Sequence, residues 1–258
     1  MIEGVLLDLG GIVYVGDEPL SGALEALDRL RGAGLSLRYI TNATRTPKRA
    51  MLDKLRRLGV PAEAGDLFMP ALAARHYLEA RGLSPALLVH PALEEDFEGL
   101  SSEGPNAVVI GDAAQGFTYP ALNAAFRSIE AGAEFLALAR NRSFQDDDGS
   151  LSLDAGPFVV ALEYASGRKA TLFGKPSRAF FEAALGSLGC PAEAAVMVGD
   201  DVESDVAGAM AVGLAGLLVR AGKYRPGDEA RITPPPSAVL ADLSEALDWI
   251  LKRARRAG

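Results

Sequence analysis

The feature that most constrains the fold is an alternation of short apolar runs with segments of helical spacing. Residues 5–7 and 35–40 are apolar runs of strand length, whereas 21–33 and 48–58 repeat apolar side chains with a helical period. Consecutive parallel strands need crossover connections, usually helices. The order strand, helix, strand, helix therefore predicts an α/β fold with a parallel sheet.

The same alternation returns near the C-terminus after a different middle region. Strands are expected at 170–173, 195–198, 214–219 and 238–240, with helices at 179–188, 201–211 and 244–254. The middle region has its own strands and helices, at 86–90, 107–110, 119–131, 134–139 and 157–165. These patterns predict a core domain made of residues 1–71 and 171–258, interrupted by a second α/β domain at 72–170. Within this second domain, the acidic residues 146–149 are expected to form a surface turn rather than a cation loop.

Composition excludes several classes of protein. The 258 residues carry a net charge of −8, which argues against a nucleic-acid partner that binds through bulk charge. No apolar run reaches the roughly 18 residues of a membrane span, so no membrane partner is expected. Cys190 is the single cysteine, which suits a reducing compartment. A strand-like run this near the first residue leaves no signal segment, so we expect a cytoplasmic protein.

Four polar segments directly follow apolar runs, where parallel strands end. The carboxyl ends of parallel strands meet at one edge of a sheet, which is where open α/β sheets bind ligands. The segments supply a carboxylate, hydroxyl and amide donors, a lysine and an acidic cluster, which together suit the transfer of a phosphoryl group. In chain order they are Asp8-Leu9-Gly10-Gly11, Thr41-Asn42, Lys175-Pro176-Ser177, and Gly199-Asp200-Asp201 with Ser204-Asp205.

The acidic segments suggest a nucleophile and a metal site. Asp8 can attack phosphorus from a strand end, although an aspartate there can also simply stabilise a turn. Asp200, Asp201 and Asp205 lie so close in sequence that a cation among them is expected, and Mg²⁺ suits carboxylates combined with phosphate oxygens. Asp200 is the expected direct ligand. Capping of the following helix is the alternative role for Asp201 and Asp205.

The remaining segments suit phosphate binding. Lys175 lies between Gly174 and Pro176, where a fixed ammonium can neutralise phosphate charge, but an isolated lysine is usually a surface residue. Thr41 and Asn42 offer hydroxyl, amide and backbone donors ahead of a helix. Taken alone, these two residues are also typical of a turn.

Together, these segments and their order resemble the four motifs of the haloacid dehalogenase superfamily. The resemblance extends to the branch with a large α/β cap that includes nucleotide and nitrophenyl phosphatases. It implies a Rossmann-like core with an inserted cap, and a small phosphorylated substrate. It makes Asp8 the nucleophile, Thr41 the hydroxyl of the second motif, Lys175 the catalytic lysine, and Asp200 with Asp205 the acids of the fourth. Mg²⁺ would be bound by Asp8, Asp200 and the backbone carbonyl of Gly10, and cap-mediated homodimers are an expectation.

One position departs from the superfamily pattern. Most members carry a second aspartate two residues after the nucleophile, which protonates the leaving group and later activates water; here that position is Gly10. General acid–base catalysis contributes roughly 10²–10⁴-fold in rate. We therefore expect a phosphatase that favours good leaving groups, such as pyrophosphate, aryl or P–N phosphates. The alternative is a catalytically weak or silent phosphate-binding protein. Arg140 and Arg142 are candidates to contact substrate from the cap.

Overall fold

The computed structural model describes residues 1–101, 103–145 and 150–254. Residues 146–149, for which the sequence predicts an acidic turn, lie outside the described residues. The chain divides into two compact units. The first unit comprises residues 1–41, 51–68 and 175–258, and the second comprises 42–50 and 69–174. The domain limits inferred from the sequence, 72 and 170, stay a prediction.

The first unit is built on a six-stranded sheet in the order β14-β13-β12-β1-β4-β5, in which every neighbouring pair is parallel. All five residues of β1 and of β12 are buried, as expected where helices cover both faces of a parallel sheet. The predicted α/β class is confirmed. Its strands are β1 (Gly4–Asp8), β4 (Ser36–Ile40), β5 (Leu67–Phe68), β12 (Ala195–Gly199), β13 (Ala215–Val219) and β14 (Ala238–Leu240). The helices are α1 (Ala23–Gly32), α2 (Lys48–Arg57), whose first turn belongs to the second unit, α6 (Arg178–Leu188), α7 (Gly208–Met210) and α8 (Leu243–Leu251).

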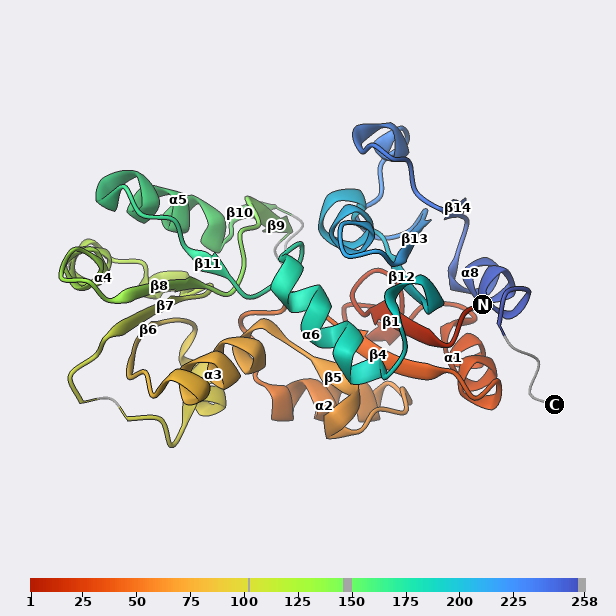
Figure 1. The fold of residues 1–258 in the computed structure, drawn as a ribbon, viewed down its shortest axis with the longest axis horizontal. Coiled ribbons are helices and arrows are strands. Elements are labelled where there is room, and N and C mark those ends of the chain that lie inside the picture. Colours follow the sequence, from red (N-terminus) through yellow and green to blue (C-terminus); the bar gives the residue numbers. More distant parts are fainter. Residues whose placement is uncertain (102, 146–149, 255–258) are drawn as a thin grey trace. The chain divides into compact units, whose positions relative to one another are not determined.

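The strand order places the point of reversal at β1. From β1 the chain continues to β4 and β5 on one side, and later fills the other side with β12, β13 and β14 (Figure 1). Asp8, the last residue of β1, pairs with Ile40, and its neighbour Leu7 pairs with Val198. The residues that follow β1, β4 and β12 therefore meet at one edge, where open α/β sheets bind ligands.

The second unit has its own four-stranded sheet in the order β11-β8-β7-β6, again all parallel. One core cluster packs α3 on one face, and another packs α4 and α5 on the other. Its strands are β6 (Pro85–Leu88), β7 (Ala107–Ile110), β8 (Glu134–Ala137) and β11 (Thr171–Leu172), with an antiparallel pair β9 (Ser143–Gln145) and β10 (Leu151–Leu153). The helices are α3 (Pro70–Arg81), α4 (Tyr119–Glu130) and α5 (Ala155–Ser166).

Several predicted boundaries differ from the structure for local reasons. The strand expected at 86–90 ends at Leu88, because His90 Nδ1 accepts the N–H of Ala92 and begins a 3₁₀ turn. The helix expected at 157–165 begins earlier, since the Asp154 carboxylate accepts the N–H of Ala155. Two short hairpins went unrecognised in the sequence: β9 with β10, and β2 (Tyr14–Val15) with β3 (Glu18–Pro19).

The helix predicted at 201–211 is interrupted. It begins as a π-helical turn over Val202–Ala207, in which the N–H of Val206 reaches the carbonyl of Asp201, and only then becomes α7. Wide turns of this kind are rare and occur often at functional sites. This turn carries Asp205, whose side chain is buried.

Candidate functional site

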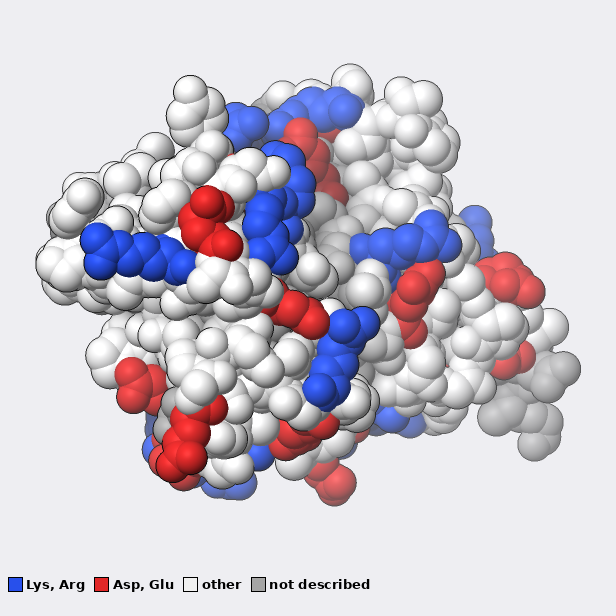
Figure 2. Space-filling model, turned by 60° about the vertical axis from the view of Figure 1, so that its left-hand side comes forward, with Lys and Arg blue, Asp and Glu red and all other residues white. Residues whose placement is uncertain are grey.

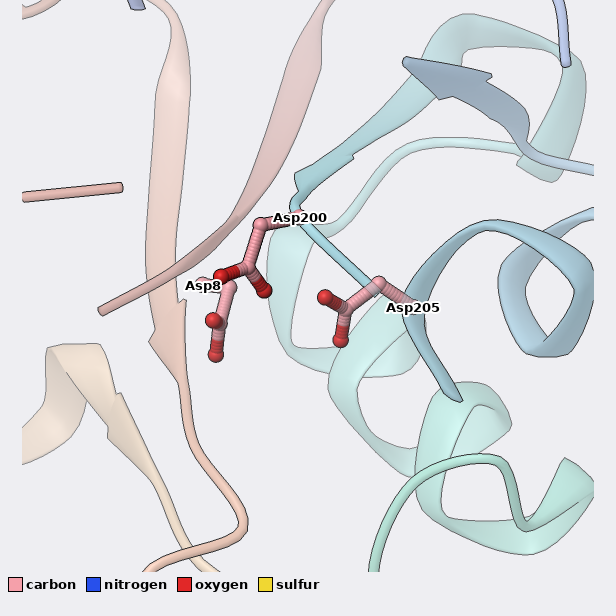
Figure 3. A group of neighbouring side chains, drawn as sticks. All are labelled: Asp8, Asp200 and Asp205. Carbon is pink, nitrogen blue, oxygen red and sulfur yellow. The ribbon is translucent and has the colours of Figure 1, made fainter. Parts of the chain in front are cut away.

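Three aspartates converge at the carboxyl edge of the first unit's sheet. Asp8 ends β1, Asp200 directly follows β12, and Asp205 comes from the π-helical turn (Figure 3). One carboxylate oxygen from each lies within 4.8 Å of the others, and all three residues are buried. Like charges this close, with little solvent to screen them, repel strongly unless cations accompany them.

Lys175 supplies one such cation. Its Nζ lies 2.6 Å from Asp8 Oδ1 and 2.7 Å from Asp205 Oδ1, and only 4% of the residue is exposed. Burial alone would lower the pKa of Lys175, but the carboxylates of Asp205 and Asp8 outweigh it and raise the pKa above its ordinary value. The lysine is therefore a fixed ammonium that ties the end of β1 to the π-helical turn.

Asp200 is held differently, by the backbone amide of Lys223. Its Oδ2 accepts the backbone N–H of Lys223 at 2.8 Å, while its Oδ1 is buried and has no hydrogen-bond partner among the described residues. Burial, followed by the charges of Asp8 and Asp205, raises the pKa of Asp200 from 3.8 to about 7. Burying a carboxylate oxygen without a partner costs free energy, and a cation bound to Asp200 Oδ1 would offset that cost.

The side chains of Asp205 and Asp201 make different contacts. Burial raises the pKa of Asp205 to about 6 despite the opposing charge of Lys175, and its Oδ2 accepts the N–H of Asp201. The Asp201 side chain caps the π-helical turn by accepting the N–H groups of Glu203 and Ser204. The capping alternative raised from the sequence therefore describes Asp201, whereas Asp205 faces the other two acids.

Thr41 and Asn42, the residues of the second motif, belong to different units. Thr41 is buried and directly follows β4, whose last residue pairs with Asp8. Asn42 is the first residue of the second unit, in which its Oδ1 lies beside Gly174, the residue before Lys175. Their proposed contacts with phosphate stay a prediction.

Arg140 and Arg142, the arginines expected to contact substrate, belong to the second unit. Arg140 Nη2 pairs at 2.6 Å with the buried carboxylate of Glu163 within the second unit, and the role of Arg142 stays a prediction. Acidic and basic side chains are mixed over the face drawn in Figure 2. Among the described residues, no helix is long and apolar enough to cross a membrane.

The acids fit a hard divalent cation. One carboxylate oxygen from each aspartate lies within 4.8 Å of the others, and Asp200 Oδ1 is an oxygen donor without a partner among the described residues. Oxygen ligands of this kind are those that Mg²⁺ takes, together with waters and substrate phosphate. Participation of the Gly10 carbonyl, which the resemblance implies, stays a prediction.

Sequence reasoning missed the residues that surround Asp200. The Lys223 amide donates to its carboxylate, and Gly11 and Gly222 lie against the same oxygen. Gly11, the second glycine of the Gly10-Gly11 pair, was the one local signal in the sequence. Its role depends on contacts with Asp200 and Gly222, which are far away in the sequence.

Fold and site together define an α/β protein with a parallel, Rossmann-like sheet and a cluster of buried acids at its carboxyl edge. Over 251 residues the chain is 44% identical to human haloacid dehalogenase-like hydrolase domain-containing protein 2, covering 97% of this chain and 96% of the relative. It is 42% identical to the zebrafish phospholysine phosphohistidine inorganic pyrophosphate phosphatase, covering 97% and 94%. Family models for haloacid dehalogenase-like hydrolases match residues 5–101 and 172–246. The chain belongs to the haloacid dehalogenase-like hydrolase family.

Solved structures agree with this assignment. A 4-nitrophenylphosphatase from Thermotoga maritima superposes with a TM-score of 0.87 at 28% identity, over 96% of this chain and 97% of that one. A glycerol phosphate phosphatase from Mycobacterium tuberculosis, in complex with magnesium, superposes with a TM-score of 0.83 at 27% identity, over 95% and 76%. The predicted superfamily is confirmed.

Proposed function

We propose that this protein is a Mg²⁺-dependent phosphatase that works through an aspartyl-phosphate on Asp8. The observation that carries the proposal is the buried contact between Asp8 and Lys175 beside two further acids at the reversal point of the sheet. Asp8, Asp200 and the carbonyl of Gly10 would hold the ion, with Asp205 beside them. When bound, Mg²⁺ would neutralise charge on the carboxylates and on the phosphoryl oxygens.

In the first step, an oxygen of Asp8 attacks the phosphorus of the substrate. A bond forms between that oxygen and phosphorus, and the bond to the leaving group breaks with its electron pair on the leaving atom. Lys175, held 2.6 Å from Asp8 Oδ1, fixes the carboxylate and opposes the negative charge of the phosphoryl oxygens. Thr41 and Asn42 would donate hydrogen bonds that position the phosphoryl group.

In the second step, water attacks the phosphorus of the aspartyl-phosphate. Its oxygen bonds to phosphorus, the bond to Asp8 breaks, and the water proton passes to solvent, so that phosphate and free Asp8 result. Gly10 has no side chain that could give a proton in the first step or take one in the second. Leaving groups that depart without a proton should therefore react best.

The expected substrate class follows from the lack of a proton-transfer side chain at Gly10. Pyrophosphate, aryl phosphates and P–N phosphates all have leaving groups that need little protonation or are readily expelled. The names of the zebrafish relative and of the Thermotoga structure support this choice, since they describe a pyrophosphate phosphatase and a nitrophenylphosphatase. The second unit would act as the cap that selects among such substrates and excludes bulk water.

The test is an assay of the purified full chain with p-nitrophenyl phosphate and pyrophosphate, with and without Mg²⁺. The matched variant is Asp8→Asn, which keeps the shape of the side chain but is a poor nucleophile. Metal-dependent turnover that disappears in Asp8→Asn is the expected result. Turnover that survives in Asp8→Asn would refute the aspartyl-phosphate route.

Gly10 also favours a second candidate, a phosphate-binding protein with little or no turnover. The same site would then bind phosphate or vanadate, but product would not form faster than with Asp8→Asn. Binding without turnover on good leaving groups would support this candidate over the enzyme.

A further inference from the structure

The carboxylate of Asp200 lies between two glycines from separate loops. Gly11 belongs to the loop after β1, and Gly222 to the loop after β13. A Cβ on Gly11 would collide with Asp200 Oδ2, and so would a Cβ on Gly222. The two backbones also approach each other closely: a Cβ on Gly222 would lie 2.8 Å from the Cα of Gly11.

Both glycines are also required by backbone conformation. Gly11 has a φ of 84° and Gly222 a φ of 48°, in the left-handed region that side chains other than glycine rarely adopt. Other glycines share such angles without any close neighbour; Gly16, with a φ of 57°, has nothing within 4 Å of its Cβ position. At Gly11 and Gly222, by contrast, the absence of a side chain is what leaves room for a carboxylate.

The same loop fixes how that carboxylate is turned. Lys223, the residue after Gly222, donates its backbone N–H to Asp200 Oδ2 at 2.8 Å. This bond and the two glycines enclose Oδ2, so Oδ1 is the oxygen left buried without a hydrogen-bond partner among the described residues. A cation among Asp8, Asp200 and Asp205 needs one carboxylate oxygen from each, and Oδ1 is the Asp200 oxygen that no hydrogen bond among the described residues occupies.

We infer that the Gly222–Lys223 turn is a positioning element for the metal-binding carboxylate, which holds Asp200 Oδ2 so that Oδ1 is presented to the cation. The inference rests on the proposed Mg²⁺ site. It assigns the positioning to the backbone of Lys223, and none of it to the lysine ammonium. Groups that orient metal ligands typically affect metal affinity by about 10–100-fold.

The first test measures Mg²⁺ binding to the full-length chain by titration calorimetry. Gly222→Ala should raise the Kd for Mg²⁺ about tenfold or more. Gly16→Ala is the matched control, because it carries a similar φ with open space around it, and it should leave the Kd unchanged. Lys223→Ala should not weaken Mg²⁺ binding, since it keeps the amide that donates to Asp200 and removes only a positive charge near the acids.

Two outcomes would overturn the inference: unchanged Mg²⁺ affinity in Gly222→Ala, or a loss in Lys223→Ala as large as the loss in Gly222→Ala. Failure of the proposed function is distinguishable from either, because then the wild-type chain itself would bind no Mg²⁺.

A thermal double-mutant cycle tests the steric part without any metal, and applies even if Gly222→Ala does not fold. Gly11→Ala should lower the Tm more in the wild-type chain than in an Asp200→Ala background, where the colliding carboxylate is gone. The free-energy cost of placing alanine at a positive φ is the same in both backgrounds, so it cancels when the two losses of Tm are compared. Equal losses of Tm in the two backgrounds would refute the steric role of the glycines.

Discussion

Replacing Asp200 with asparagine should stabilise the metal-free protein at pH 8. The native fold raises the pKa of Asp200 from 3.8 to about 7, chiefly because the carboxylate is buried and next because it faces Asp8 and Asp205. Each pKa unit corresponds to about 1.4 kcal/mol, so ionised Asp200 costs the fold up to roughly 4 kcal/mol. Asparagine removes this cost, and its amide oxygen can still accept the N–H of Lys223.

The sign of the effect sets its pH dependence. Because the folded-state pKa is the higher one, the cost is nearly absent below pH 4, where Asp200 is protonated in both states. It grows as the pH rises from about 4 to 7, and is complete above that. The advantage of Asp200→Asn should therefore be largest at pH 8 and fade toward pH 4.

The assay is thermal unfolding in EDTA at pH 4.5 and pH 8. For a chain of this size, 1 kcal/mol shifts the Tm by roughly 2–4 °C, so removing a cost of up to roughly 4 kcal/mol should raise the Tm by up to about 8–16 °C at pH 8. Asp28→Asn is the matched control, because Asp28 is exposed and outside the cluster. Mg²⁺ at 100 times its Kd should stabilise the wild type by about 2.7 kcal/mol and so raise its Tm, and it should raise the Tm of Asp200→Asn much less.

A lower Tm for Asp200→Asn than for the wild type at pH 8 in EDTA would refute this reasoning. A gain that is the same at both pH values would refute it as well, since it would have another cause than the ionised carboxylate.

Two further predictions concern the catalytic groups. Gly10→Asp should raise turnover of alkyl phosphates by up to roughly 10²-fold, because it supplies a proton-transfer group. The new side chain has room, since no atom lies within 4 Å of the Cβ position of Gly10. An unchanged kcat on glycerol phosphate would show that the missing proton-transfer group is not the cause of slow turnover. Lys175→Met should destabilise the fold by about 3–5 kcal/mol, because it leaves Asp8 and Asp205 buried without their cation. Denaturant unfolding in EDTA measures this loss, and a loss below about 1 kcal/mol would contradict the proposed role of the lysine as the cation of this pair.

Much of the fold and of the site could be predicted from local sequence. Apolar runs of strand length followed by polar residues are local patterns, and the rule that ligands bind where parallel strands end needs no coordinates. Asp8, Lys175, Asp200 and Asp205 were selected in this way, and the structure brings all four together. Short elements with weak periodicity, such as β2 and β9, were missed because each has two or three residues.

The sequence by itself determined which residue types stand at the strand ends, because strand formation and burial follow from the local apolar pattern. Only the tertiary structure decided what the neighbouring glycines do. Gly10 and Gly11 are alike in sequence, yet a side chain at Gly10 would meet open space, whereas one at Gly11 would strike Asp200. That difference, like the bond from Lys223 to Asp200, depends on how β13 is placed beside β12 and β12 beside β1. Such contacts join residues far apart in the chain, so no local pattern encodes them.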